Sequence, residues 1–348
     1  MAAVCMLLVI FIHLLPFYSH ANDINAFKCV NIYEQPAFRH PKLKHHKLQT
    51  KPNLPVFPVH DVSSPSTIAS PDECAKGQVP VHVNTPSPQL LDKNSGVKYT
   101  AAVSTIPGKK TYRGGAAVYG VFNPPVTLMQ SSRANIWVQN GPESQLNSIE
   151  AGWAVHPDLY ADNNTRLTAY WTEDDFRTTG CYNLLCPGFV QIDSSTFLGK
   201  SFPPESLPCT KTIAIMQDKV TGNWWLIAGT DLIVVVGYWP KELFDYLALG
   251  ADIVKHGGTT STYLDQLDRP PMGSGRYPNE WKVPGFTWIQ YVNDSYQLVE
   301  ADRGEMMKVL DSVCYDLQQF TLAGAVPKEG IRYGGPGGTP QKCKQLPA

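Results

Sequence analysis

The chain has 348 residues, of which 43% are hydrophobic and only 17% charged, and its formal net charge is −1. That length allows one large domain, with or without an extra module. The near-zero charge gives no case for nucleic-acid binding. The 29 prolines and 27 glycines argue against a helical bundle and favour many short strands joined by turns.

The first residues are typical of a secretory signal peptide. Residues 4–15 form an apolar run that is too short to span a bilayer, and Ser19 and Ala21 are small residues suited to cleavage after Ala21. No Lys or Arg precedes the run, and a buried N-terminal helix is the alternative. No later run reaches the roughly 18 apolar residues of a membrane helix. We therefore predict a secreted, extracellular protein without a membrane span.

A basic segment and a proline-rich linker follow. Residues 24–52 contain five Lys and Arg39 against the single acid Glu34, and eight prolines lie between Pro52 and Pro88. Such a linker is stiff and extended. The basic segment is either a disordered tail or a small module ahead of a cleavable linker, as in many zymogens.

From about Tyr99 onward, short apolar stretches predict strands and only one helix. The helix is expected at residues 240–249, with Pro240 at its first position and Gly250 just past its end. About ten strands and one helix indicate an all-β fold, either an antiparallel sandwich or a barrel. The expected strands lie at residues 116–123, 133–140, 148–155, 166–173, 188–195, 211–218, 223–240, 285–294 and 296–302.

The remaining motifs are few. Seven cysteines follow the signal peptide, so at least one thiol is left without an intramolecular partner; four residues separate Cys181 and Cys186, which favours a short disulfide loop. Asn163 and Asn293 begin N-x-S/T sequons and are expected glycan sites.

We find no metal-binding, nucleotide-binding or serine-hydrolase motif, and expect no metal and no cofactor. His156 and His256 are predicted to be surface or loop residues rather than general bases.

One carboxylate stands out in the strand predicted at 148–155. Ile149, Ala151, Trp153 and Val155 alternate with smaller or polar residues, and Glu150 lies among the latter. Glu is a poor strand former. It is either an ordinary exposed strand residue or a functional acid that needs a partner.

Several long stretches together resemble one family, the plant neprosin-domain proteins. They are "CVNIYEQPAFRHPKLKHHKLQ", "LNSIEAGWAVHPDLYADNNTRLTAYWT", "TGCYNLLCPGFVQ", "VGYWPKELFDYLALGADIVKHGG" and "PMGSG". The family is named for a secreted glutamic endopeptidase that cleaves after proline. The resemblance covers nearly all of the chain after the signal peptide.

The resemblance implies a sandwich of two stacked antiparallel sheets, preceded by a basic prosegment that caps the cleft in cis and is removed at acid pH. It implies a signal peptide at 1–21, a prosegment and linker at 22–97, and a sandwich domain at 98–348. It also implies the disulfides Cys181–Cys186 and Cys314–Cys343, which match pairs of the family. We further predict Cys29–Cys74, which leaves Cys209 as the odd thiol.

The family's chemistry uses two glutamates, of which one takes a proton from water and the other supports the carbonyl oxygen. By resemblance Glu150 is one of them, and Trp153 helps to form the substrate-binding wall. The second position, after a Trp-Gly-Gly segment in the family, is Thr259 here, and His256 replaces the tryptophan. Asp265 and Asp268 follow Thr259 by six and nine residues. Only a bulge or loop could bring either carboxylate back to the position of the second glutamate.

We therefore expect a secreted relative of a prolyl glutamic endopeptidase whose peptidase activity is weak or absent. Its partner would be a proline-rich polypeptide. An alternative is a catalytically inactive binding module for proline-rich chains or for cell-wall carbohydrate. The carbohydrate hypothesis rests on candidate stacking residues Trp153, Trp171, Trp224, Trp225 and Trp288.

The basic prosegment suggests docking on an acidic surface. Acid would then loosen it, because surface carboxylates gain protons while His40, His45 and His46 become charged.

Overall fold

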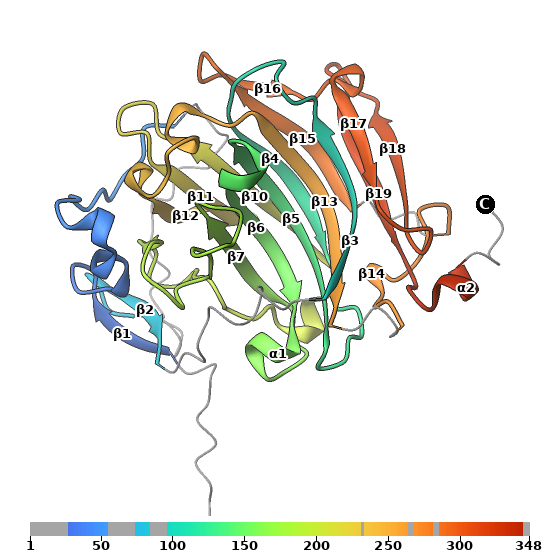
Figure 1. The fold of residues 1–348 in the computed structure, drawn as a ribbon, viewed down its shortest axis with the longest axis horizontal. Coiled ribbons are helices and arrows are strands. Elements are labelled where there is room, and N and C mark those ends of the chain that lie inside the picture. The colour runs from blue at the N-terminus through green and yellow to red at the C-terminus, as the bar shows by residue number, and fades with distance from the viewer. Residues whose placement is uncertain are drawn as a thin grey trace, which may run out of the picture.

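A computed structural model describes residues 27–54, 74–83, 96–230, 233–263, 268–280 and 285–343. Within these residues the chain forms two large stacked antiparallel sheets and a small two-stranded sheet, which confirms the all-β sandwich (Figure 1). The predicted signal peptide lies outside the described residues.

The first large sheet has seven strands. In spatial order they are β17 (Met306–Leu310), β3 (Val97–Thr105), β13 (Ile253–Thr262), β5 (Gln130–Asn140), β6 (Asn147–Val155), β7 (Arg166–Thr172) and β8 (Cys181–Tyr182).

The second large sheet has ten strands. Its main path is β14 (Met272–Gly273), β19 (Lys328–Gly335), β15 (Phe286–Asn293), β4 (Tyr112–Val121), β10 (Cys209–Gln217), β11 (Trp224–Gly229), β12 (Ile233–Trp239) and β9 (Val190–Gln191). Off this path, β16 (Leu298–Glu300) pairs with β15 and β18 (Asp316–Leu322) pairs with β19.

Helical structure in the described residues is short. The α-helical turns are α1 (Pro157–Tyr160) and α2 (Pro340–Cys343). The 3-10 turns are η1 (Pro36–Arg39), η2 (Pro41–Leu43), η4 (Glu143–Gln145), η5 (Pro204–Ser206), η6 (Lys241–Leu243), η7 (Leu247–Leu249) and η8 (Arg303–Glu305). No described helix is long and apolar enough to cross a membrane.

The helix predicted at residues 240–249 is instead the pair of 3-10 turns η6 and η7. Tertiary contacts use the backbone groups that a continuous helix would pair internally. Asn147 Oδ1 accepts from the amides of Tyr246 and Leu247 at 2.7 and 3.1 Å, and the Trp224 indole donates to Leu247 O at 3.0 Å. Buried Leu243 and Leu247 face the core from the two turns, so packing overrides the local helix signal.

The core lies between the two large sheets, and β6 shows how it forms. Ile149, Ala151, Trp153 and Val155 alternate along the strand and all are buried in the main hydrophobic cluster. The Trp153 indole donates to the backbone oxygen of Gly120 in β4 at 2.9 Å, so one side chain links the two sheets. Because side chains alternate across a strand, the residues between them, including Glu150, face outward.

The two-stranded sheet belongs to an N-terminal segment, by which we mean residues 27–54 and 74–83. In it β1 (Phe27–Asn31) pairs with β2 (Gln78–His82). In Figure 1 this segment (blue) lies at the side of the sandwich, next to β12.

We expect Trp153→Leu to lower the free energy of unfolding by roughly 2–4 kcal/mol, because it opens a cavity and removes the inter-sheet hydrogen bond. The matched control is Trp288→Leu, since Trp288 is 54% exposed; its effect should stay within about 0.5 kcal/mol. Chemical denaturation measures both. Equal losses at the two positions would contradict the core assignment of Trp153.

Candidate functional site

The outer face of the seven-stranded sheet carries the candidate site. In the strand register Glu150 of β6 lies opposite Trp137 of β5 on one side and Tyr170 of β7 on the other. Trp137 in turn lies opposite Lys255 of β13. Cross-strand partners share a face, so these four side chains form one row across the sheet.

Glu150 has a polar and a cationic neighbour. The Asn135 amide donates to Glu150 Oε2 at 3.2 Å, and the carboxylate is half-buried. The Lys255 ammonium lies 4.6 Å from the centre of the Trp137 ring. Burial lowers the pKa of Lys255, while the charges of Glu150 and Asp311 partly offset that effect. Glu150 is therefore electrostatically coupled to an ammonium group on its own face of the sheet.

Thr259 lies on the same face but apart from Glu150. It pairs with Arg133 of β5, and Arg133 pairs with Ala154, four residues from Glu150 on β6. For strands about 4.8 Å apart and about 3.3 Å per residue, this offset corresponds to roughly 16 Å between the Cα atoms of Thr259 and Glu150. A threonine side chain is far too short to bridge that separation.

The residue beside Thr259 is cationic. Arg133 is buried and its Nη1 donates to the Tyr182 hydroxyl at 2.7 Å, with the guanidinium 5.9 Å from the centre of that ring. Directly paired strand residues have Cβ atoms about 4.5–5.5 Å apart. The sheet order is β13, β5, β6, β7 and β8, so the guanidinium extends toward β8 and away from position 259, which holds a glutamate in the resemblance.

A row of stacked aromatic rings borders Glu150. Tyr170 lies 4.2 Å from Tyr182 and 4.4 Å from Phe176, measured between ring centres. Lys98 of β3 lies 5.6 Å from the Phe176 ring, so the loop after β7 reaches across the face toward the other side of the sheet. Phe176 and Glu150 are both half-buried, which leaves part of each accessible to a ligand.

The two substitute acids do not complete a pair with Glu150. Asp265 lies outside the described residues. Asp268 is exposed, and its backbone oxygen accepts from the side chain of Gln130 at 2.6 Å. Gln130 is the first residue of β5, at the far end from Trp137, the partner of Glu150. Asp268 is therefore held at the wrong end of the sheet to share a water with Glu150.

Trp153 is not part of this face. It is 0% exposed and its ring packs edge-on against Phe122 in the core. The prediction that Trp153 helps to bind substrate is wrong, because odd-numbered residues of β6 point inward. The aromatic neighbours of Glu150 are instead Trp137 and Tyr170.

The two histidines are also buried. His256 is fully buried between the rings of Phe286 and Tyr291, and burial lowers its pKa to about 3, so it is neutral in the folded protein. The prediction of a surface or loop position for His256 is wrong. His156 does precede α1 in a loop, but it is covered and lies 5.6 Å from the Tyr182 ring.

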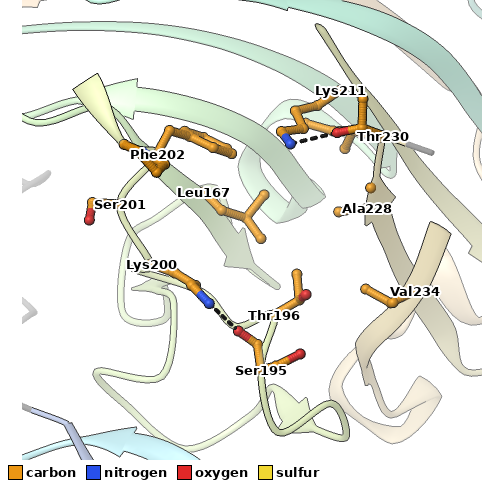
Figure 2. Close-up of a pocket in the computed structure, with 13 residues that line it drawn as sticks. Leu167, Ser195, Thr196, Lys200, Ser201, Phe202, Lys211, Ala228, Thr230 and Val234 are labelled. Atoms are coloured by element: carbon orange, nitrogen blue, oxygen red, sulfur yellow. Dashed lines mark hydrogen bonds between the residues drawn. The ribbon is translucent and has the colours of Figure 1, made fainter. Parts of the chain in front are cut away.

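A cavity does exist in the molecule, but it is not at Glu150. It opens between β7, β10, β11 and β12 and the loop at 195–203 (Figure 2). The described residues contain no group of three or more His, Cys, Asp or Glu side chains placed to hold a metal ion.

The N-terminal segment docks on the opposite sheet. Ala37, with Phe38 and Leu48, packs against Trp225 and Tyr238, which form a cluster separate from the main core. Trp224 and Trp239, their neighbours in the chain, belong to that core, so the docking surface is the outer face of the ten-stranded sheet. None of the hydrogen bonds, ion pairs or ring contacts made by the described residues of the segment involves Glu150. The expectation that the segment caps the cleft of Glu150 is not met by these residues.

Polar contacts then orient the docked segment. Asp218 Oδ2 accepts from the Gln49 side chain at 2.8 Å and from the Asn53 amide at 2.5 Å. His46 Nε2 lies 2.9 Å from the Tyr238 hydroxyl. Further acids face the segment: Lys42 pairs with Glu173 and lies 3.9 Å from Asp245, and His46 lies 3.4 Å from Glu242.

A sequence model of the family described as Neprosin matches residues 129–336, more than half of the chain. The chain belongs to the Neprosin family. Among solved structures, Scytalido-glutamic peptidase with a peptide-based transition state analogue is similar at 8% identity and a TM-score of 0.36. SCP-B, a member of the Eqolisin family of peptidases in complex with the tripeptide Ala-Ile-His, is similar at 8% identity and a TM-score of 0.33. Both alignments cover 69% of this chain and 98% of the other. Similarity at this level does not show which reaction, if any, this chain catalyses.

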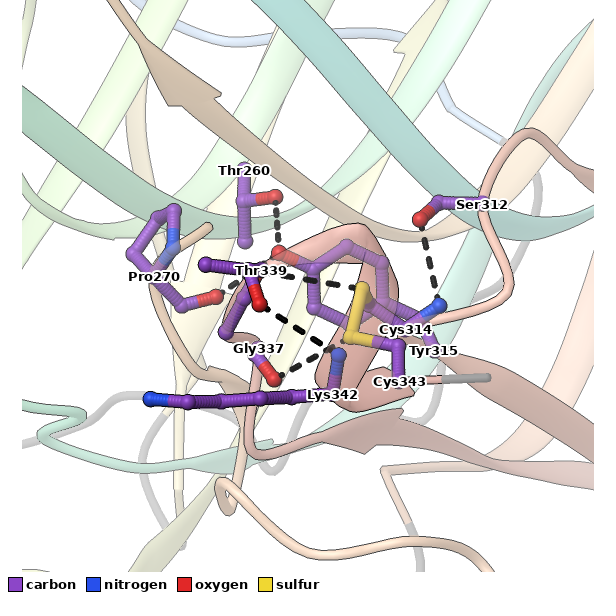
Figure 3. The surroundings of a disulfide bond; sticks show 10 residues. Thr260, Pro270, Ser312, Cys314, Tyr315, Gly337, Thr339, Lys342 and Cys343 are labelled. Atoms are coloured by element: carbon purple, nitrogen blue, oxygen red, sulfur yellow. Dashed lines mark hydrogen bonds between the residues drawn. A yellow bond between two sulfur atoms is a disulfide. The ribbon is translucent and has the colours of Figure 1, made fainter. Parts of the chain in front are cut away.

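The Neprosin-family chain has the three disulfides that were expected: Cys29–Cys74, Cys181–Cys186 and Cys314–Cys343. Among the described residues Cys209 is the free thiol, and burial raises its pKa against the opposing charge of Lys211. Figure 3 shows Cys314–Cys343 beside Tyr315, whose hydroxyl accepts from Thr260 at 2.9 Å and donates to Pro270 O at 2.7 Å. This disulfide therefore helps to hold the strand that carries Thr259.

The two glycan sites remain predictions. Asn163 is exposed, as a modified asparagine must be. The side-chain amide of Asn293 donates to Gln297 Oε1 at 3.2 Å within a turn, so that bond must open before a sugar can be attached.

Glu150→Gln should lower the pKa of Lys255 further, because the substitution removes a negative charge that partly offsets burial. NMR titration of isotope-labelled lysine side chains measures this shift. Glu205→Gln, in the exposed turn η5, is the control and should leave the pKa of Lys255 unchanged. A Lys255 pKa that is unchanged or raised in Glu150→Gln would contradict the coupling.

Docking of the N-terminal segment should weaken as pH falls below about 6.5, the ordinary histidine value. Burial lowers the pKa of docked His40, against the charge of Glu173, so the undocked state binds more protons in that range. Burial opposes ionisation of Asp218, but hydrogen bonds from Asn53 and its neighbours outweigh it and lower the pKa. The contribution of Asp218 to docking therefore persists to lower pH. It is lost only as the pH falls through the lowered pKa of Asp218.

Amide hydrogen exchange of residues 41–54 tests both steps. His40→Gln should remove the loss of protection just below pH 6.5, and Asp218→Asn should reduce protection even at neutral pH. Protection factors, that is, exchange rates relative to the intrinsic rate at each pH, that stay the same between pH 7 and pH 3 would rule out this acid-dependent docking.

Proposed function

We propose that this Neprosin-family protein is secreted and binds extended, proline-rich polypeptides on the face around Glu150, with weak or absent peptidase activity. The observation that supports it most is that Thr259 occupies the position where the family resemblance expects a second acid. Three disulfides fit an oxidising, extracellular compartment.

Hydrolysis by a carboxylate pair needs one ionised and one protonated acid near the same peptide bond. Glu150 is available as a base, but a threonine hydroxyl cannot supply the proton for the leaving amine. Loss of one such group typically costs about 10²–10⁴ in rate.

Binding has better support on this face. Proline-rich chains adopt extended helices that dock on aromatic-lined surfaces. Next to Glu150, the half-buried ring of Phe176 stacks on Tyr170, which stacks on Tyr182; both tyrosines are buried, so Phe176 is the ring of this row that a ligand can reach. Lys255 and Asn135 add donors for the backbone oxygens of a bound chain.

Carbohydrate binding through stacked tryptophans loses its basis. Of the five candidates, Trp153, Trp171, Trp224 and Trp225 are buried, and only Trp288 is exposed. One exposed ring does not make a stacking platform.

A second candidate function is residual peptide hydrolysis by Glu150 with Lys255 as proton donor. It is favoured by one observation, the lowered pKa of an ammonium group that senses Glu150. Perturbed titrating groups beside a carboxylate are candidates for catalysis. This activity would disappear in both Glu150→Gln and Lys255→Met.

Restoring an acid tests the assignment of position 259. Thr259→Glu should cleave proline-rich peptides at least tenfold faster than the wild-type protein, because it supplies the second carboxylate of an acid–base pair. Peptide cleavage is read by mass spectrometry at acid pH, beside Thr259→Gln as the matched control, which should cleave no faster than the wild-type protein. Fast cleavage by the wild-type protein that depends on Glu150 would overturn the proposal of weak activity.

A further inference from the structure

A separate pocket lies at one end of the sandwich, between the two sheets. Leu167 of β7 contributes from the first sheet, and Ile213 of β10 and Ala228 of β11 contribute from the second. The cavity has a volume of about 470 Å³, within the usual range for small-molecule sites. Leu167 belongs to the core cluster, so the pocket opens from the inner side of β7, whereas Glu150 lies on the outer face of the neighbouring strand.

The pocket has an apolar floor and a polar rim. Leu167, Ile213 and Ala228 are buried at its base. The loop at 195–203 and the turn after β11 form the rim, and their hydroxyl groups belong to Ser195, Thr196, Ser201 and Thr230. This combination suits a ligand with an apolar body and one polar end.

Two lysines supply positive charge at that rim, as Figure 2 shows. Lys200 Nζ donates to Ser195 O at 2.7 Å, and Lys211 Nζ donates to Thr230 Oγ1 at 2.5 Å. Both acceptors are neutral, and neither lysine forms an ion pair with a carboxylate of the described residues. Each ammonium carries three donors, so donors remain for an anionic ligand.

Aromatic rings hold the two lysine side chains in place. Lys200 Nζ lies 5.6 Å from the centre of the Phe197 ring, and Lys211 Nζ lies 5.9 Å from the centre of the Phe202 ring. Such contacts reduce the freedom of long side chains before a ligand arrives. The positive charges are therefore fixed features of the pocket mouth.

We propose that this pocket binds a small organic carboxylate with an apolar body. The carboxylate would accept charge-assisted hydrogen bonds from Lys200 and Lys211. The apolar body would cover Leu167, Ile213 and Ala228 and remove them from water. A bare inorganic anion would leave that floor wetted, and a neutral amphiphile would leave both ammonium groups without a counter-charge.

Isothermal titration of the full secreted chain at pH 7 tests the proposal with octanoate as probe. Octanoate should bind once per chain, and octanol and inorganic phosphate should each bind at least tenfold more weakly. Lys200→Gln and Lys211→Gln should each weaken octanoate binding at least fivefold. Lys109→Gln, at an exposed turn, should not change it.

Val234→Trp provides the second line of evidence, because Val234 of β12 lines the pocket and a larger ring would fill it. Thermal unfolding shows whether this variant is folded. Folded Val234→Trp should no longer bind octanoate, and Glu150→Gln should bind it normally, which separates this site from the peptide-binding face. Absence of octanoate binding, equal binding of octanol, or binding that survives Val234→Trp would each overturn the proposal.

Discussion

The packing of one face of β6 against the second sheet determines which residues the protein presents on the other. Ile149, Ala151 and Trp153 are buried between the sheets, and the Trp153 indole reaches Gly120 O across the core. A slip of one residue would turn these side chains to solvent and bury the Glu150 carboxylate among apolar groups. Burying an unpaired carboxylate is very costly. The core thus holds Glu150 on the open face.

The electrostatics of that face follow from its neighbours. Glu150 shares its face of the sheet with Lys255, two strands away, and a threonine occupies the position where a second acid is expected. Two carboxylates in one site raise each other's proton affinity, which is how a carboxylate pair keeps one proton. A cation stabilises the ionised carboxylate instead. This arrangement favours contact with a ligand over proton transfer to it.

The N-terminal segment adds a second dependence on charge. Its apolar side chains pack on the outer face of the ten-stranded sheet, and its polar side chains contact Asp218, Glu173, Glu242 and Asp245. Glu173 directly follows β7, so the segment contacts residues of both large sheets. None of these hydrogen bonds and ion pairs involves Glu150.

Much of the fold could be predicted because alternation and turns are local signals. The strand at β10, the beginning of the next strand at β11 and the strand around Glu150 were predicted from alternation, whereas the odd thiol Cys209 was inferred with the family resemblance. Strand β13 was missed because Gly257 and Gly258 interrupt its pattern, although it carries Lys255 and Thr259.

The partners of Glu150 could not be predicted for a different physical reason. They come from strands far apart in the sequence, and only the register of β5, β6 and β13 brings Trp137, Asn135 and Lys255 together. The buried position of Trp153 could have been predicted from the sequence, because an alternating strand cannot turn both Glu150 and Trp153 to the same face.

The most direct test is a crystal structure of the full-length chain, grown at acid pH with a proline-rich peptide. We expect an intact peptide along the aromatic row beside Glu150, with a backbone oxygen near Lys255. A peptide cut after proline at Glu150, or one bound away from this face, would contradict it.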